Sequence, residues 1–136
     1  MPTLKLTLSP PQHAERHAAL ARALTAITAD TLGKRAEVTA VLIDERPPGT
    51  WYVAGRPPLR PTALLEIDIT EGSNTAAQKA AFIDAAFGEL QRQLTPNASL
   101  EEASYVIVRE VPASDWGYGG RTQHARRRAS ELAAQT

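Results

Sequence analysis

The sequence of 136 residues contains no cysteine, which excludes disulfides, thiolate metal sites and cysteine nucleophiles. Its three histidines (His13, His17 and His124) are scattered, which argues against a histidine-rich metal site. Neither sign of charge is in excess, because 15 Lys and Arg residues balance 15 Asp and Glu residues, so we expect no nucleic-acid partner. No apolar run approaches the roughly 20 residues of a membrane span, and no signal-peptide pattern opens the chain. We therefore expect a soluble, cytoplasmic protein with no metal and no membrane partner.

The chain instead contains an internal repeat. Residues 37–56 align with residues 102–121 at an offset of 65 and without a gap. The identical pairs include both tryptophans of the chain: Glu37/Glu102, Val41/Val106, Glu45/Glu110, Pro47/Pro112, Trp51/Trp116, Gly55/Gly120 and Arg56/Arg121. Upstream, Leu4, Leu6 and Leu8 match Leu65, Ile67 and Ile69 at an offset of 61. The second copy therefore has four more residues, which we place in residues 95–99.

Each copy is predicted to contain two strands. Residues 4–8 and 65–69 alternate apolar and polar side chains, which is the period of a half-buried strand. Residues 38–44 and 104–110 are rich in β-branched and apolar side chains and give the second strand of each copy. A proline ends each second strand, and a turn with glycine and aromatic residues follows.

A helix is predicted between the two strands of each copy. The first should begin near residues 9–12, where Ser9 can cap it, and its apolar stripe is Leu20, Leu24 and Ile27. The second should begin at a capping box formed by Thr75 and Gln78. Its predicted apolar stripe is Ile83, Phe87, Leu90 and Leu94.

These elements predict an α+β fold built from tandem βαβ units. A crossover helix makes the two strands of a unit parallel. We expect residues 1–57 to form the first unit, residues 58–121 the second, and residues 122–136 a basic C-terminal tail or helix, all within one structural domain. The result is a four-stranded sheet with two helices on one face. The other face is bare, so we expect oligomerisation.

Pro2 is the residue that we expect to carry the chemistry. Removal of Met1, which a small second residue permits, would leave a free prolyl amine. An α-amine titrates near pH 8, and burial or neighbouring cations make it a neutral base at physiological pH. Pro61-Thr62 echoes Pro2-Thr3, but the nitrogen of Pro61 lies in an amide and cannot act as a base. Each chain therefore offers at most one such amine.

An N-terminal proline that opens directly into a βαβ unit resembles the tautomerase superfamily. The second copy is similar to 4-oxalocrotonate tautomerase at residues 69–72 before the helix, 106–110 in the strand and 116–120 at the turn. The tandem arrangement resembles the fused tautomerases and the cis-3-chloroacrylic acid dehalogenase group. The resemblance covers residues 2–121 and implies a cofactor-independent keto-enol isomerase, a small carboxylate substrate such as a 2-oxo or 2-hydroxy-alkenoate acid, and a homotrimer of six βαβ units.

The chain departs from these families at their charged positions. The 4-oxalocrotonate enzymes carry arginines where this chain has Ser73 and Tyr105 in the second copy, and Gln12 and Thr39 or Ala40 in the first. The substrate clamp of the family is therefore absent or has moved.

The dehalogenases carry a late-helix histidine and two arginines, and here the matching places hold residues 28–30, Thr70 and Ser73. Water addition to an unsaturated acid thus stays an alternative with little support. A non-catalytic oligomeric binding protein on the same scaffold is a second alternative.

Four residues are candidates for substrate binding beside Pro2. Arg109 and Arg46 lie near strand ends and can pair with a carboxylate or enolate, Tyr105 can donate from its hydroxyl, and Trp116 can form an apolar wall. Trp51 is expected to serve packing instead. The repeated Glu45 and Glu110 are interpreted as structural hydrogen-bonding groups at strand ends, and Arg126, Arg127 and Arg128 as a helix face.

Overall fold

The computed structural model describes residues 2–135. Met1, whose removal the proposed chemistry requires, lies outside the described residues, as does Thr136. The first unit comprises strand β1 (Thr3–Ser9), helix α1 (Ala14–Leu32), the short 3₁₀ helix η1 (Ala36–Val38) and strand β2 (Ala40–Glu45). The second comprises β3 (Thr62–Thr70), α2 (Ala76–Leu94) and β4 (Tyr105–Val111). A small hairpin of β5 (Gly117–Tyr118) and β6 (Arg121–Thr122) then leads into α3 (Gln123–Ala134).

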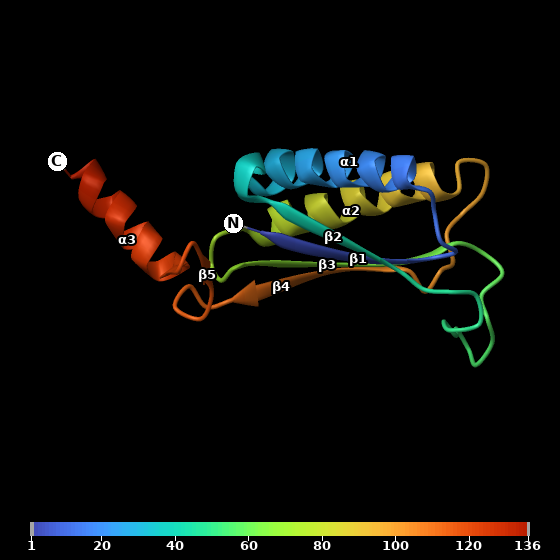
Figure 1. The fold of residues 1–136 in the computed structure, drawn as a ribbon. Coiled ribbons are helices and arrows are strands. Elements are labelled where there is room, and N and C mark those ends of the chain that lie inside the picture. The colour runs from blue at the N-terminus through green and yellow to red at the C-terminus, as the bar shows by residue number, and fades with distance from the viewer. Residues whose placement is uncertain (1, 136) are drawn as a thin grey trace.

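The predicted fold class is confirmed. The four main strands form one sheet in the order β2-β1-β3-β4, with parallel pairs within each unit and an antiparallel pair, β1 with β3, between the units. Helices α1 and α2 cover the same face of this sheet (Figure 1). Helix α3 extends from one end of the sheet, beside the chain's N-terminus (Figure 1).

The strand register confirms the internal repeat. Leu4 pairs with Val41 in the first unit, and Leu65 pairs with Val106 in the second, which reproduces both sequence offsets, 61 and 65. Helices α1 and α2 each have 19 residues and begin 62 positions apart. The offset thus rises from 61 to 62 before α2 and from 62 to 65 after it. One of the four additional residues therefore precedes α2, and the other three follow it. The predicted placement after the helix is correct for these three residues only.

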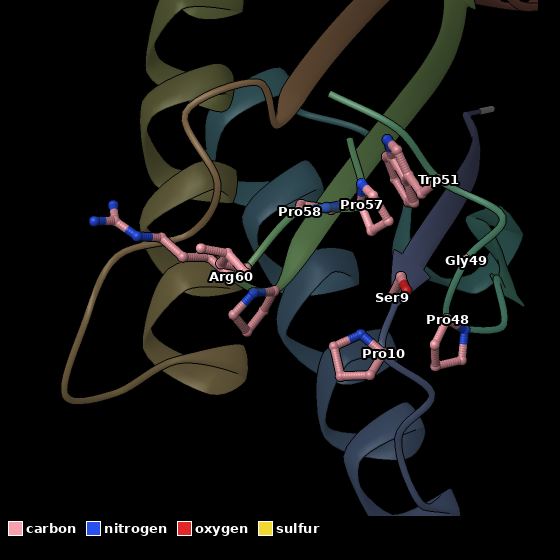
Figure 2. Close-up of a pocket in the computed structure, with 10 residues that line it drawn as sticks. Ser9, Pro10, Pro48, Gly49, Trp51, Pro57, Pro58 and Arg60 are labelled. Carbon is pink, nitrogen blue, oxygen red and sulfur yellow. The ribbon is translucent and has the colours of Figure 1, made fainter. Parts of the chain in front are cut away.

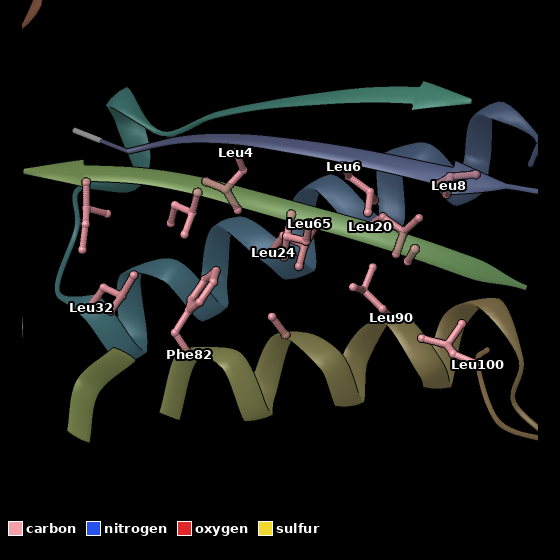
Figure 3. Packing of buried hydrophobic residues seen from close by; sticks show 14 residues of the cluster. Leu4, Leu6, Leu8, Leu20, Leu24, Leu32, Leu65, Phe82, Leu90 and Leu100 are labelled. Atoms are coloured by element: carbon pink, nitrogen blue, oxygen red, sulfur yellow. The ribbon is translucent and has the colours of Figure 1, made fainter. Parts of the chain in front are cut away.

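The core lies between the sheet and the two helices (Figure 3). Its fully buried strand residues alternate with polar ones, as the sequence predicts: Leu4, Leu6, Leu8, Leu65, Ile67 and Ile69. In α2 the predicted stripe is confirmed at Leu90, which is fully buried, and at Phe87 and Leu94, which are partly buried against the core. It is wrong at Ile83, which is 39% exposed, whereas Phe82 and Ala86 are fully buried. Helix α2 packs against α1 as well as the sheet, through contacts such as Gln93 with Arg16, so its buried face is turned toward α1.

One predicted helix start is confirmed and one is wrong. Thr75 caps α2, and Gln78 completes the capping box by accepting from the Thr75 backbone N–H at 2.9 Å. Helix α1 begins at Ala14 rather than near residues 9–12, with His13 as its cap. Ser9 is unavailable as a cap because it is the last residue of β1, where it pairs with Thr62 of β3.

The sheet face away from the helices is mixed in character. Arg109 of β4 donates to Glu66 of β3 at 2.8 Å on this face, and Leu42 of β2 is 47% exposed. None of the helices formed by residues 2–135 is long and apolar enough to cross a membrane. Nor do these residues bring three potential His, Asp or Glu metal ligands together.

The repeated glutamates hold the two helices to the strand ends. Glu45 accepts from the Gln12 backbone N–H and contacts His17 Nε2 at 3.0 Å, while Glu110 pairs with Lys79 Nζ at 2.8 Å. His17 and Lys79 occupy equivalent positions in the first turns of α1 and α2. These contacts confirm the structural interpretation of both glutamates. The Gln12 N–H, followed by His17, lowers the pKa of Glu45, and the Lys79 ammonium lowers the pKa of Glu110.

These two pairs predict a pH-dependent stability. A carboxylate with a lowered pKa stabilises the fold above its unfolded value of about 4.3, and this stabilisation is lost as the pH falls through the folded value. The Glu45→Gln/Glu110→Gln double variant should therefore unfold at a lower temperature than wild type at pH 6, and the difference should shrink by pH 3. Thermal unfolding followed by circular dichroism measures both.

Glu102→Gln is the matched control, because Glu102 is exposed and forms no ion pair among residues 2–135. Its unfolding temperature should equal that of wild type at both pH values. A double variant as stable as wild type at pH 6 would contradict the structural role.

Candidate active site

Pro2 lies buried at the entrance to β1, the central position of one end of the sheet. Its carbonyl oxygen accepts from the Ala40 backbone N–H of β2 at 3.3 Å. On the other side, the pairing of Thr3 with Asp68 places Ile69 of β3 beside it. The end of the sheet that holds Pro2 also receives the C-terminal end of α1, the β5–β6 hairpin and α3 (Figure 1).

The second unit has no counterpart of this proline. The offset of 61 places Ala63, rather than Pro61, at the position equivalent to Pro2. The Ala63 nitrogen is a peptide N–H that donates to Ser104 Oγ at 3.1 Å, so it has no lone pair available for proton transfer. Only the Pro2 end of the sheet can hold an amine base.

A cavity of ≈ 260 Å³ opens at this same end, and we call it the cationic pocket. Its lining residues come from the loop after α1, the end of β3, the hairpin and α3: Gly33, Lys34, Arg35, Val38, Thr70, Tyr118, Gln123, Arg126, Arg127 and Ser130. Four of them are cationic and none is acidic. Thr70 directly follows Ile69, the neighbour of Pro2, and Val38 lies two residues before Ala40, so the pocket adjoins the segments on either side of Pro2, although Pro2 is not one of its lining residues.

Lys34 is fixed on one wall of the cationic pocket. Gly33, at a φ of +68°, ends α1 and turns the chain so that Lys34 leaves the helix axis. The Lys34 ammonium donates to Ser73 Oγ at 2.9 Å, and the neighbouring Asn74 side chain donates to the Leu32 carbonyl at 2.9 Å. Burial, together with the positive charge of Arg127, lowers the pKa of Lys34.

Helix α3 forms the opposite wall. Thr122 caps the helix by accepting from the Ala125 N–H at 3.0 Å. Arg126 donates to the Tyr118 carbonyl at 2.9 Å and stacks over the Tyr118 ring, 3.8 Å from its centre. Two buried donors here, Arg126 Nε and Gln123 Nε2, have no acceptor among the described residues.

A comparison of the turn after β2 with the equivalent β5–β6 turn shows how closely Arg126 covers the hairpin. Val53 bridges Arg56 just as Tyr118 pairs with Arg121 in the second copy. The first turn accepts Ala54 at a φ of +54°, whereas the second has Gly119 at +61°. A side chain at Gly119 would lie 2.8 Å from Arg126 Nη2, and no helix follows the first turn to create such a clash.

Trp116 is the one predicted substrate-binding residue that the fold brings to the Pro2 end with its side chain unpaired. It is half-buried, and its indole N–H is buried without an acceptor among residues 2–135. Its carbonyl oxygen accepts from the Gln123 N–H at 2.8 Å, which joins it to the α3 wall of the cationic pocket.

The other three predicted residues lie elsewhere within one chain. Arg109 is at the same end of the sheet but on the bare face, where its guanidinium pairs with Glu66; that carboxylate raises the pKa of Arg109. Arg46 follows β2, and Tyr105 opens β4, both at the far end of the sheet. Tyr105 pairs with Leu64, which lies five residue steps from Ile69 along β3, a distance of about 17 Å. Only a neighbouring chain can bring Arg46 or Tyr105 to Pro2.

A second cavity, of ≈ 270 Å³, occupies the far end of the sheet. Five of its ten lining residues are prolines, and they come from the loops after β1, after β2 and before β3 (Figure 2). Trp51 lines this cavity and is half-buried, in keeping with its expected packing role. Arg60 is its only charged residue, so this pocket offers no base or acid for catalysis.

Sequence reasoning missed Lys34 altogether and assigned Arg126 and Arg127 to a helix face. A signal for Lys34 was present: it follows the glycine that ends α1, and the ends of α1 and β3 meet at the edge of the sheet where β1 begins. No pattern in the sequence showed that α3 shares a pocket with this loop, because the helix has no buried residue that would mark its packed side.

Similar proteins of known family share this fold. A family model described as tautomerase enzyme matches residues 2–58, beginning at Pro2. A structure described as R7 fused 4-OT wild type asymmetric trimer is 30% identical, with a TM-score of 0.80 over 92% of this chain and 98% of that chain. A native fused 4-OT is 31% identical, with a TM-score of 0.77 over 90% and 97%.

A more distant structure shares the fold alone. N1, a member of the cis-3-chloroacrylic acid dehalogenase family, is 22% identical, with a TM-score of 0.77 over 98% of this chain and 96% of that chain. No curated protein matches the chain. Because the fused 4-OT structures match nearly their whole length at 30% identity or more, with the same tandem units, the chain belongs to the tautomerase superfamily, in its fused 4-oxalocrotonate tautomerase form.

Proposed function

We propose that this protein is a cofactor-independent tautomerase in which the amine of Pro2, freed by removal of Met1, interconverts the keto and enol forms of a 2-oxo or 2-hydroxy-alkenoate acid. The observation that carries the proposal is the position of Pro2, buried at the start of β1 and at the same end of the sheet as a pocket lined by four cations. Both burial and neighbouring positive charge disfavour a protonated amine, so Pro2 would be a neutral base near pH 7.

The proposed reaction is a proton transfer that balances without any other reagent. The Pro2 nitrogen takes a proton from the enol oxygen or from a carbon next to the carbonyl, and the electron pair moves through the conjugated system. The resulting prolinium then returns the proton to the other end of that system. Negative charge on the enolate oxygen is stabilised by the cations at this end of the sheet, and Trp116 is the proposed apolar wall.

We keep three of the predicted substrate contacts on the condition that chains assemble: Arg109, Arg46 and Tyr105. Two of them lie at the far end of their own chain, and Arg109 is already paired with Glu66. The similar structures described as trimers support an assembly of several chains. That one chain's far end meets a neighbour's Pro2 end in such an assembly is part of the proposal.

The tautomerase reaction is favoured over water addition. Residues 28–30, which match the place of the dehalogenase histidine, contain no histidine, and Thr28 is fully buried, with its hydroxyl donating to the Leu24 carbonyl at 2.7 Å. Such a side chain cannot orient a water molecule toward a substrate. The remaining alternative is a non-catalytic binding protein. Measurable turnover would exclude it, and the absence of turnover would favour it.

Blocking the Pro2 nitrogen should abolish most activity. In a form that retains Met1 this nitrogen is an amide without a usable lone pair, so kcat/KM should fall by at least about 10²–10⁴-fold, the usual contribution of a general base. Pro2→Ala keeps a primary amine and should lose less. Phenylenolpyruvate and 2-hydroxymuconate, followed by ultraviolet absorbance, measure the rates, and intact mass reports the state of Met1.

The pH dependence and the fold serve as controls for this experiment. For the processed enzyme, kcat/KM should rise with pH along a limb that reports deprotonation of the amine, below the value for a free prolyl peptide. Circular dichroism should be unchanged in both altered forms, because position 2 only opens a strand. Equal turnover by the Met1-retaining and processed forms would exclude the amine as the catalyst.

The protein is also proposed to assemble as a homotrimer. The sheet face away from the helices and the edge strands β2 and β4 are uncovered in the single chain, and the similar structures are described as trimers. Native mass spectrometry or light scattering should give three times 14.7 kDa. A monomer at micromolar concentration would contradict the assembly and, with it, any role for Arg46 and Tyr105.

A further inference from the structure

We propose that α3 supplies the carboxylate clamp of this site: Arg126 and Arg127, facing Lys34 across the cationic pocket, hold a carboxylate group of the substrate. The inference rests on the proposed function, because it concerns the acid on which Pro2 would act. It also accounts for the missing family arginines, since the positive charge expected near residues 12 and 73 is supplied instead from the C-terminal helix.

The first support is an unbalanced charge. Lys34, Arg126 and Arg127 form no ion pair with any carboxylate among residues 2–135, although four other Lys and Arg side chains do. The fourth cation, Arg35, has its partner in Glu37, 3.5 Å away. Three uncompensated cations around one cavity repel each other, and a bound anion removes that repulsion. The lowered pKa of Lys34, caused by burial and by Arg127, is the expected sign of this crowding.

The second support is unused hydrogen-bonding capacity. Arg126 Nε and Gln123 Nε2 are buried donors that have no acceptor among residues 2–135. A buried donor without an acceptor is unfavourable, unless a bound ligand provides the acceptor. The two oxygens of a carboxylate match the planar fork of a guanidinium. Both nitrogens are shielded from solvent, so a small shift of α3 must accompany binding. The helix can make that shift because none of its residues is buried.

The size of the pocket limits the ligand. Its ≈ 260 Å³ lie just below the range of about 300–1,000 Å³ that holds drug-sized molecules. A pocket of this size suits a small acid rather than a drug-sized molecule. The proposed substrate class is therefore a short 2-oxo or 2-hydroxy-alkenoate acid, with its carboxylate between Lys34 and α3 and its reactive carbons toward Pro2.

Calorimetric titration with muconate and with pyruvate tests the clamp without requiring turnover. Arg127 is the primary position, because Arg126 also anchors the hairpin through Tyr118. Arg127→Ala should weaken binding about tenfold or more, the usual result of losing one charge-assisted hydrogen bond. Arg127→Lys, which keeps the charge without the fork, should fall between Arg127→Ala and wild type. Arg128→Ala is the matched control on the same helix, since Arg128 is exposed and does not line the pocket; it should stay within about twofold.

The titrations are repeated on the Met1-retaining form, so that failure of the clamp and failure of the proposed function can be told apart. Binding that survives Met1 retention and is lost in Arg127→Ala supports the clamp even if no substrate is turned over. If turnover depends on Pro2 but Arg127→Ala binds both acids as tightly as wild type, the proposed tautomerase function is supported and the clamp is overturned. Equal weakening by Arg127→Ala and Arg128→Ala, or no binding of either acid to wild type, also overturns it.

Discussion

The antiparallel pairing of β1 with β3 is the constraint on which the rest of this structure depends. Within each unit a helix crosses between two parallel strands, and neither unit has another strand neighbour inside the chain. The central ladder joins them into one sheet and brings Leu6 opposite Leu65, so that both apolar strand faces meet the same pair of helices. It also sends the two units in opposite directions, which puts the start of β1 beside the end of β3. Pro2 thereby meets the second unit's C-terminal hairpin and helix.

Because the two units run in opposite directions, equivalent segments of the repeat lie at opposite ends of the sheet. The side chains of these segments differ, so the two ends differ in chemistry. At one end lie a buried proline and a pocket with four cations, three of them without an ion pair among the described residues, and α3 forms one wall of this pocket. At the other end the equivalent nitrogen, that of Ala63, is an amide donor, and the pocket is lined with prolines. Repetition thus supplied the scaffold, and the substitutions on it decide where a proton can be exchanged.

Much of the fold was predictable because it depends on short-range patterns. Alternation in residues 4–8 and 65–69 showed the core strands, and the capping box at Thr75 fixed the start of α2. The errors occurred where a distant contact decides the outcome. Ser9 cannot cap α1 because it pairs with Thr62, and Phe82 rather than Ile83 is buried because α2 also packs on α1.

The candidate site was less predictable for the same reason. Pro2 could be identified from its position in the chain, and Trp116 from the repeat. Arg46 and Tyr105 sit near strand ends as expected, but at the end away from Pro2. Lys34 and Arg127 come from segments more than 90 residues apart, and only the closed fold shows that they share a pocket.

The amide at Ala63 has a consequence for how such a chain can diverge. The second unit contributes no proline amine of its own, so the proposed proton transfer depends on one end of the sheet only. The 16 residues between β2 and β3 form much of the proline-lined pocket at the other end, and of these only Arg46 is a proposed substrate contact, made to a neighbouring chain. The rest of this loop can therefore acquire a different binding preference without changing the groups proposed for proton transfer.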